Sequence, residues 1–223
     1  MAQKLMMGRA HFRRRTSSSS RTLSEKNVKF FPKSARAKAR SEVLAQKARG
    51  AIKKLLEEDH ADIDRNTHLL QDSLTNLCYE GKAAFGKNLK ELQHILEFFD
   101  DEAARHVQFE ENVLFPFLKV HIPKLESLLN ILSSEHESFK HHLSDFKFYL
   151  ASISKMESRP ERSKMIEKIR ETGTYLIFLL RNHIQTEEKS VYEVLVRELR
   201  PLEGKEIEDL AKQCAAILGN GKH

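Results

Sequence analysis

Residues that interrupt helices are scarce in this chain. Its 223 residues include eight glycines, five prolines and no tryptophan, whereas leucine, glutamate, lysine and alanine are abundant. Because glycine and proline disfavour the helix interior and the four abundant residues favour it, the composition predicts an all-α fold. Hydrophobic residues make up 40% of the chain, which suffices for one core in a domain of ordinary size.

Cysteines and long apolar runs are also scarce. The two cysteines, Cys78 and Cys214, lie far apart in helical sequence, which is typical of reduced, buried thiols in an intracellular protein. No run approaches 18 apolar residues, so the sequence predicts no transmembrane segment. We therefore expect a cytoplasmic protein.

Acidic residues are nearly absent from the first 50 positions. This stretch holds 14 Lys and Arg against Glu25 and Glu42, a local charge of 14 − 2 = +12, whereas the whole chain carries +6. Residues 1–40 also hold too few apolar residues for a core, so we expect a disordered basic tail. This Arg/Ser-rich tail could simply aid solubility, direct the chain to an organelle, contact nucleic acid or anionic lipid, or be phosphorylated.

A histidine and a glutamate four residues apart occur twice in helical sequence. His106 precedes Glu110, and His183 precedes Glu187. This spacing puts both side chains on one face of a helix, so an imidazole and a carboxylate can converge on one metal ion.

A further histidine precedes each pair at nearly the same distance. His60 lies 46 residues before His106, and His136 lies 47 residues before His183. A repeat of this period predicts a duplicated helical hairpin, and two such hairpins make an up-down-up-down four-helix bundle with these side chains pointing inward.

Apolar periodicity places the helices of this bundle. Four long helices are expected to begin near Ser41, Asn88, Pro123 and Pro160. The second of them should end near Pro116 or Pro123. The bundle would then occupy residues 41–200, and residues 201–223 would add a short C-terminal helix and tail, packed outside the bundle or against a partner.

The order and flanking residues of these motifs resemble those of hemerythrin-like proteins, the HHE cation-binding domains. The similarity covers about residues 50–200 and depends on residues 57–60, 106–116, 134–136 and 183–188. The resemblance implies a four-helix bundle that binds non-haem iron.

The repeat supplies six candidate metal ligands: His60, His106, Glu110, His136, His183 and Glu187. Four imidazoles and two carboxylates are too many for one closed tetrahedral zinc site, which usually contains thiolates. They suit two ions of higher coordination number, bridged by both glutamates. The resemblance favours two iron ions of the Fe–O–Fe type, and manganese or zinc would also accept these ligands.

The neighbours of the candidate ligands receive separate predictions. Glu111 and Glu188 follow the ligand glutamates and should point about 100° away from them, toward solvent. Asp59 and Glu135 precede ligand histidines and could accept hydrogen bonds from a neighbouring ligand. The other histidines of the bundle are expected to be structural or exposed: His68, His94, His121, His141 and His142.

Two positions depart from the oxygen-carrying members of the family. Those proteins have a fifth histidine one turn after the third-helix ligand, where this chain has Lys140, and their last acid follows its histidine by five residues, whereas Glu187 follows by four. The site is therefore similar to the four-histidine, two-glutamate version of iron-centre repair proteins and iron-sensing domains. The cysteine-bearing N-terminal domain of the repair proteins is lacking.

These observations favour a di-iron protein that binds or senses O2, NO or iron, with peroxide as a further small ligand. Two alternatives remain. The same centre could belong to a redox enzyme that reduces peroxide or NO or repairs iron centres. The chain could also be a metal-free helical interaction module whose basic tail binds nucleic acid or a membrane.

Overall fold

The computed structural model of the chain describes residues 33–79, 82–199 and 204–219, and within these ranges it contains helices and short loops but no strand. The all-α prediction is confirmed. Most of the predicted disordered tail lies outside the described residues. Its last eight positions, 33–40, are helical, so the first helix begins earlier than the predicted Ser41.

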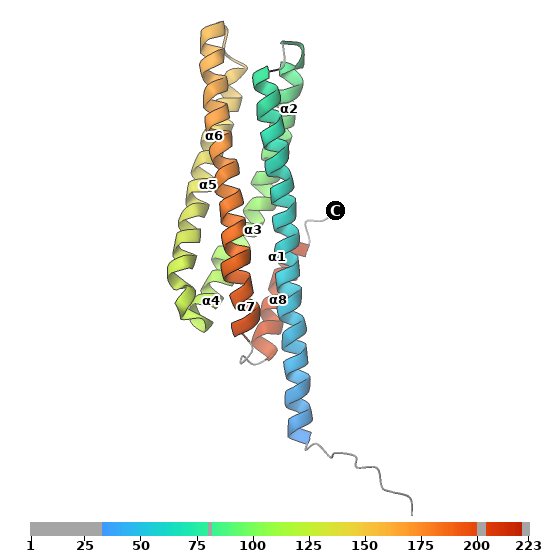
Figure 1. Cartoon of the computed structure of the whole chain (residues 1–223). Helices are drawn as coiled ribbons and strands as arrows, with labels where there is room; N and C mark the ends of the chain where they lie inside the picture. Colours follow the sequence, from blue (N-terminus) through green and yellow to red (C-terminus); the bar gives the residue numbers. More distant parts are fainter. Residues whose placement is uncertain (1–32, 80–81, 200–203, 220–223) are drawn as a thin grey trace, which may run out of the picture.

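The first hairpin pairs one uninterrupted helix with one segmented helix (Figure 1). Helix α1 spans Lys33–Tyr79. The chain returns through five segments joined end to end: α2 (Lys82–Phe98), η1 (Phe99–Ala103), α3 (Ala104–Phe109), η2 (Glu110–Leu114) and α4 (Phe115–His121). The segments η1 and η2 are π-helical turns.

Proline does not end the second helix at the first predicted position. Pro116 lies in the first turn of α4, where the missing N–H costs little, and the helix continues to His121. Pro123 then opens the 3₁₀ turn η3 (Pro123–Leu125) that leads into the third helix.

The second hairpin repeats the arrangement of the first. Helix α5 spans Glu126–Ile153 and is uninterrupted, and the chain returns through α6 (Arg159–Thr186), the π-helical η4 (Glu187–Tyr192) and α7 (Glu193–Glu198). The start of α6 follows its sequence signals: the Ser158 hydroxyl accepts a hydrogen bond from the Glu161 N–H at 3.3 Å, and a proline stands in the first turn.

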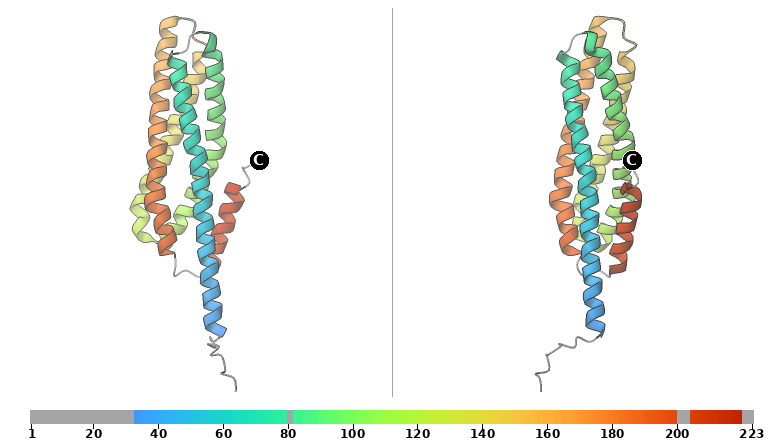
Figure 2. Two further views of the ribbon diagram at one scale, coloured as in Figure 1. Left: turned by 45° about the vertical axis from the view of Figure 1, so that its right-hand side comes forward. Right: turned by 90° about the vertical axis from the view of Figure 1, so that its right-hand side faces the viewer.

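The two hairpins pack side by side as a four-helix bundle, and α1 extends beyond it at its N-terminal end (Figure 2). Helix α8 (Gly204–Leu218) lies outside the bundle against α1 and α3. It buries Ile207, Leu210, Cys214 and Leu218. Burial raises the pKa of the Cys214 thiol to about 12, as expected for an unreactive core cysteine. No described helix is apolar enough over a sufficient length to cross a membrane, although α1 has 47 residues.

Buried apolar side chains in the described part of the chain form two clusters along the bundle. One cluster lies near α4, α7 and α8, and the other lies toward the loop between α5 and α6. Representative members of the first are Ile52, Leu56, Leu118, Leu129 and Leu195, and of the second Leu70, Leu74, Leu92, Phe146 and Leu176. A layer of buried polar side chains separates them.

Candidate metal centre

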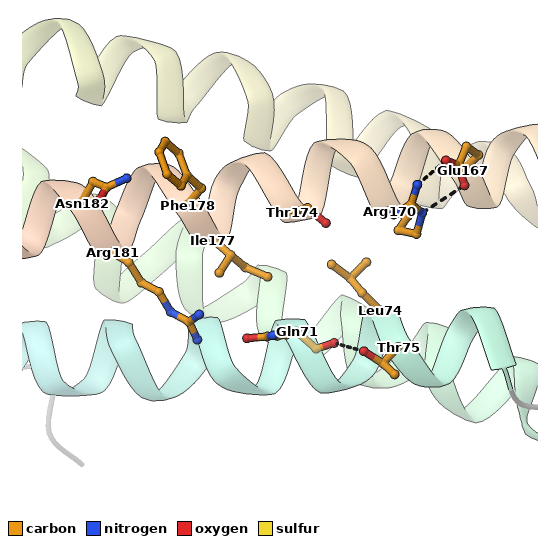
Figure 3. A pocket seen from close by; sticks show the side chains of 10 residues that line it. All are labelled: Gln71, Leu74, Thr75, Glu167, Arg170, Thr174, Ile177, Phe178, Arg181 and Asn182. Carbon is orange, nitrogen blue, oxygen red and sulfur yellow. Dashed lines mark hydrogen bonds and ion pairs between the residues drawn. The ribbon is translucent and has the colours of Figure 1, made fainter.

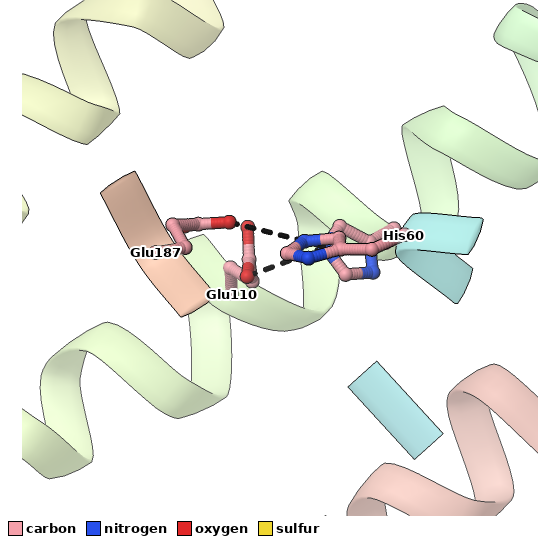
Figure 4. A group of neighbouring side chains, drawn as sticks. His60, Glu110 and Glu187 are labelled. Carbon is pink, nitrogen blue, oxygen red and sulfur yellow. Dashed lines mark hydrogen bonds and ion pairs between the residues drawn. The ribbon is translucent and has the colours of Figure 1, made fainter. Parts of the chain in front are cut away.

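The polar layer consists of the six side chains that the sequence singled out. They come from every helix of the bundle: His60 from α1, His106 from α3, Glu110 from the start of η2, His136 from α5, His183 from α6 and Glu187 from the start of η4. All six are buried, and both glutamates are completely inaccessible to solvent. Figure 4 shows the two carboxylates turned toward His60.

Their ligand atoms form two overlapping groups. The first position comprises His60, His106, Glu110 and Glu187, and the second comprises His136, His183 and the same two glutamates. Within each group the ligand atoms lie within 4.8 Å of one another. The glutamates are therefore shared, and each position receives both histidines of one hairpin.

The histidines of each position face each other closely. The Nε2 atoms of His60 and His106 are 3.0 Å apart, and those of His136 and His183 are 2.9 Å apart. The opposite nitrogen of every ring, Nδ1, faces a carboxylate.

Four outer acids contact these Nδ1 atoms, and each acid comes from a helix next to that of its histidine. Glu135 accepts from His183 at 2.8 Å and Glu111 from His136 at 3.1 Å. Glu188 lies 3.3 Å from His60, and Asp59 lies 3.4 Å from His106. Each acid is adjacent in sequence to a ligand of its own helix, so the four contacts close a ring around the bundle.

The ring confirms that Asp59 and Glu135 accept hydrogen bonds from histidines of the site. The prediction that Glu111 and Glu188 point to solvent is wrong. These two glutamates do point away from their own ligand face. A rotation of about 100° from that face leads toward the neighbouring helix rather than to solvent. Both are partly covered, with 24% and 40% of the side chain exposed.

The outer acids determine which nitrogen of each ring carries hydrogen. A carboxylate can only accept, so each Nδ1 donates, and the Nε2 of a neutral ring is left with its lone pair. Two such lone pairs about 3 Å apart repel each other unless a cation lies between them. The arrangement therefore suits a metal ion bound through both Nε2 atoms.

The glutamates reach both positions. Glu110 Oε1 lies 3.3 Å from His106 and its Oε2 lies 3.4 Å from His136, while Glu187 Oε2 lies 3.2 Å from His60 and 3.4 Å from His183. These are ion-pair distances without hydrogen-bond geometry. Within the described residues, Glu110 Oε2 and both oxygens of Glu187 have no hydrogen-bond partner. Buried carboxylate oxygens left in this way are costly, and metal coordination would satisfy them.

Without a metal, the same groups attract protons. Burial alone would lower the pKa of His106, but Glu110 and Asp59 outweigh it and raise that pKa to about 10. Burial would also lower the pKa of His183, but Glu187 and Glu135 outweigh it and raise that pKa to about 10. Burial would raise the pKa of Glu110, but the neighbouring His106 and His136 hold it well below its usual range. His106 and His183 are thus held in buried ion pairs, and a metal bound at these histidines would have to displace their protons.

Lys140 and the remaining histidines lie outside the buried polar layer. Lys140, at the position of the fifth family histidine, donates to Glu111 at 3.1 Å and Glu137 at 2.8 Å on the outside of the bundle. His68, His94 and His141 are exposed on helix surfaces. His142 bonds the Ser138 carbonyl at 2.8 Å, and His121 packs half-buried on Phe117.

Two aromatic residues were missed by the sequence reasoning. Phe115 stacks on His136 with ring centroids 5.7 Å apart, and Tyr192 stacks on His60 at 5.2 Å. Each follows a ligand glutamate by five residues, so the repeat itself could have found them. The π-helical turns that begin at Glu110 and Glu187 were also missed, because no periodicity in the sequence marks them.

A small cavity adjoins the histidines on the side of the second apolar cluster. Its volume is about 20 Å³, enough for about one water-sized molecule. It is lined by the four clustered histidines, by Glu135 and by apolar side chains, among them Ile63, Val107, Phe139 and Leu180.

A larger hollow lies elsewhere, in a surface groove between α1 and α6 (Figure 3). Its volume is about 790 Å³, and it is lined by Gln71, Leu74, Thr75, Glu167, Arg170, Thr174, Ile177, Phe178, Arg181 and Asn182. None of the six clustered side chains lines it, so groove size does not locate the chemistry of this protein.

Comparison with protein families shows that the family described as "Hemerythrin HHE cation binding domain" matches residues 51–195, which include all six clustered side chains. No curated protein matches the chain.

Proposed function

Because this chain belongs to the hemerythrin HHE cation-binding family, we propose that its metal-binding domain holds two iron ions and uses them to bind or sense a small molecule. The single observation behind the proposal is that two groups of four ligand atoms share Glu110 and Glu187. Manganese or zinc could take the same ligands, but four imidazoles and two carboxylates without a thiolate are typical of non-haem iron.

The six clustered side chains would hold the ions. His60 and His106 would hold one ion through Nε2, and His136 and His183 would hold the other. The glutamates reach toward both positions, so they could serve both ions and would neutralise part of their charge. The outer acids hold each imidazole by Nδ1 and increase its basicity, which strengthens its bond to the metal.

The small cavity beside the four histidines would receive the small ligand. Its volume of about 20 Å³ suits a molecule such as O2, NO or peroxide rather than an organic substrate. Ile63, Phe139 and Leu180 exclude bulk water from that side of the histidines. When bound, the two ions supply redox chemistry and open positions at which such a molecule can bind.

Metal analysis tests the proposal directly. The chain is loaded with iron under anaerobic conditions, desalted and subjected to elemental analysis beside the double variant His106→Ala, His183→Ala. A matched control replaces two exposed histidines, His68→Ala and His94→Ala. Wild type and control should retain about two iron ions per chain, and the site variant fewer than about half an ion. A wild-type content below about half an ion contradicts the proposal.

A further inference from the structure

Tyr192 is a buried residue at which the two halves of the metal centre differ. Phe115 lies five residues after Glu110, and Tyr192 lies five residues after Glu187. Each ring stacks on the first histidine of the opposite hairpin, Phe115 on His136 with an interplanar angle of 7° and Tyr192 on His60 with 23°. The two residues therefore occupy equivalent places, and only one of them carries a hydroxyl.

The Tyr192 hydroxyl lies among the ligand atoms of the first position. It donates a hydrogen bond to Glu110 Oε1 at 2.9 Å and lies 3.1 Å from His60 Nε2. The residue is completely buried. A buried tyrosine hydroxyl normally needs a polar partner, and here both contacts are atoms that face the metal position.

Besides being hydrogen-bond distances, these spacings would also fit neighbouring ligands of one ion. Two ligand atoms bound at right angles with bonds of about 2.1 Å lie about 3 Å apart. The Nε2 atoms of His60 and His106 are 3.0 Å apart, and the hydroxyl oxygen keeps nearly the same spacing from His60 and Glu110. At the second position, the equivalent Phe115 ring offers only carbon.

We propose that Tyr192 makes the two metal positions unequal: its hydroxyl oxygen fills a place beside the ion of His60 and His106, so the exogenous ligand binds at His136 and His183. This inference rests on the proposed function. It adds that one position has five protein ligand groups and the other four, although the histidines and glutamates alone would make the two alike.

The chain offers its own matched variants, because each aromatic residue can be replaced by its counterpart. Tyr192→Phe removes one oxygen and gives both positions the same surroundings. Phe115→Tyr adds a hydroxyl to the second position. The double exchange, Tyr192→Phe with Phe115→Tyr, moves the hydroxyl from one position to the other. Thermal unfolding and iron content are measured for all four proteins, so that only folded chains with two ions are compared.

Mössbauer spectroscopy of the proteins loaded with ⁵⁷Fe(II) and titration with nitric oxide provide the readouts. We expect two distinct quadrupole doublets and one nitric oxide per chain in the wild type. Tyr192→Phe should bring the doublets together and allow a second nitric oxide to bind. Phe115→Tyr should also bring the doublets together but reduce nitric oxide binding, and the double exchange should restore two doublets.

Three outcomes distinguish the claims. Two bound ions with a single doublet in the wild type would overturn the inference about Tyr192. So would a Tyr192→Phe spectrum and nitric oxide stoichiometry identical to those of the wild type. Both results would leave the proposed function intact, whereas a wild-type chain that binds fewer than about half an ion would contradict that function itself.

Discussion

The two helical hairpins present the same metal-facing residues but hold them differently. The histidines of the second hairpin, His183 and His136, have outer acids at 2.8 Å and 3.1 Å, whereas those of the first, His106 and His60, have them at 3.4 Å and 3.3 Å. The first hairpin instead receives the Tyr192 hydroxyl beside His60. A duplicated ligand set therefore does not produce two equivalent sites, because the surroundings of each half have diverged.

The packing outside the centre diverges as well. Helix α8 covers α1 and α3 of the first hairpin, and no described helix outside the bundle covers the second hairpin in the same way. The apolar side chains of α8 join the core cluster near α4 and α7. The first hairpin is thus covered from outside by α8, whereas the histidines of the second hairpin have the closer outer acids, Glu135 and Glu111.

The largest expected effect comes from the residues that both halves share. Glu110→Gln removes a carboxylate charge from both positions, so iron content should fall from about two ions per chain to below about one. His60 belongs only to the first position, so His60→Ala should leave about one ion per chain. Glu137→Gln changes an exposed carboxylate of α5 and is the control. Elemental analysis after desalting measures the iron content of each variant. Equal losses of iron in Glu110→Gln and His60→Ala would show that the glutamate is not shared.

The metal-free protein should lose stability as pH rises. His106 and His183 each have a folded-state pKa of about 10, above the ordinary value near 6.5. A raised pKa means that their ion pairs stabilise the fold fully below about pH 6.5 and that this contribution disappears as pH rises through about 10. Metal binding displaces these protons, so metal affinity should change in the opposite direction and increase with pH.

Thermal unfolding of the chelator-treated chain between pH 6.5 and 10 measures the first trend, and competition with a chelator over the same range measures the second. His68→Gln removes an exposed histidine and should change neither trend. A metal-free melting temperature that rises across this range would contradict the assigned ion pairs.

The outer acids allow the two hairpins to be compared quantitatively. Glu135→Gln removes the shortest of the four contacts and should weaken metal binding by about 10- to 100-fold. Asp59→Asn removes the longest contact and should have the smaller effect. Chelator competition gives both affinities. A larger loss in Asp59→Asn would reverse the ranking that the distances indicate.

The smallest expected effect concerns the close approach of the second hairpin to the first. A Cβ atom on Gly173 would lie 2.6 Å from Leu74 and 2.9 Å from Phe146, so Gly173→Ala should destabilise the fold by about 1–3 kcal/mol. A Cβ atom on the exposed Gly50 of α1 would meet no atom within 4 Å, so Gly50→Ala should stabilise by about 0.5–1 kcal/mol through helix propensity. Urea unfolding of the two variants measures both changes, and a neutral Gly173→Ala would mean that α6 can move away.

Much of the fold followed from local patterns. The scarcity of glycine and proline predicted helices, and the signal at Pro160 correctly placed the start of α6. The end of the second helix was harder to place, because Pro116 is tolerated in a first turn that only the preceding π-helical turn creates. The first eight residues of α1 were missed because their basic composition is also typical of disorder.

The sequence by itself determined which six side chains meet, because the helix period and the repeated spacing leave His60, His106, Glu110, His136, His183 and Glu187 on inward faces. The tertiary structure alone decided what lies behind and between them. Which outer acid contacts which imidazole depends on how neighbouring helices pack, and the place of the Tyr192 hydroxyl depends on a π-helical turn that local periodicity does not encode. Contacts between helices are set by packing across the bundle, and spacing along one chain segment does not contain that information.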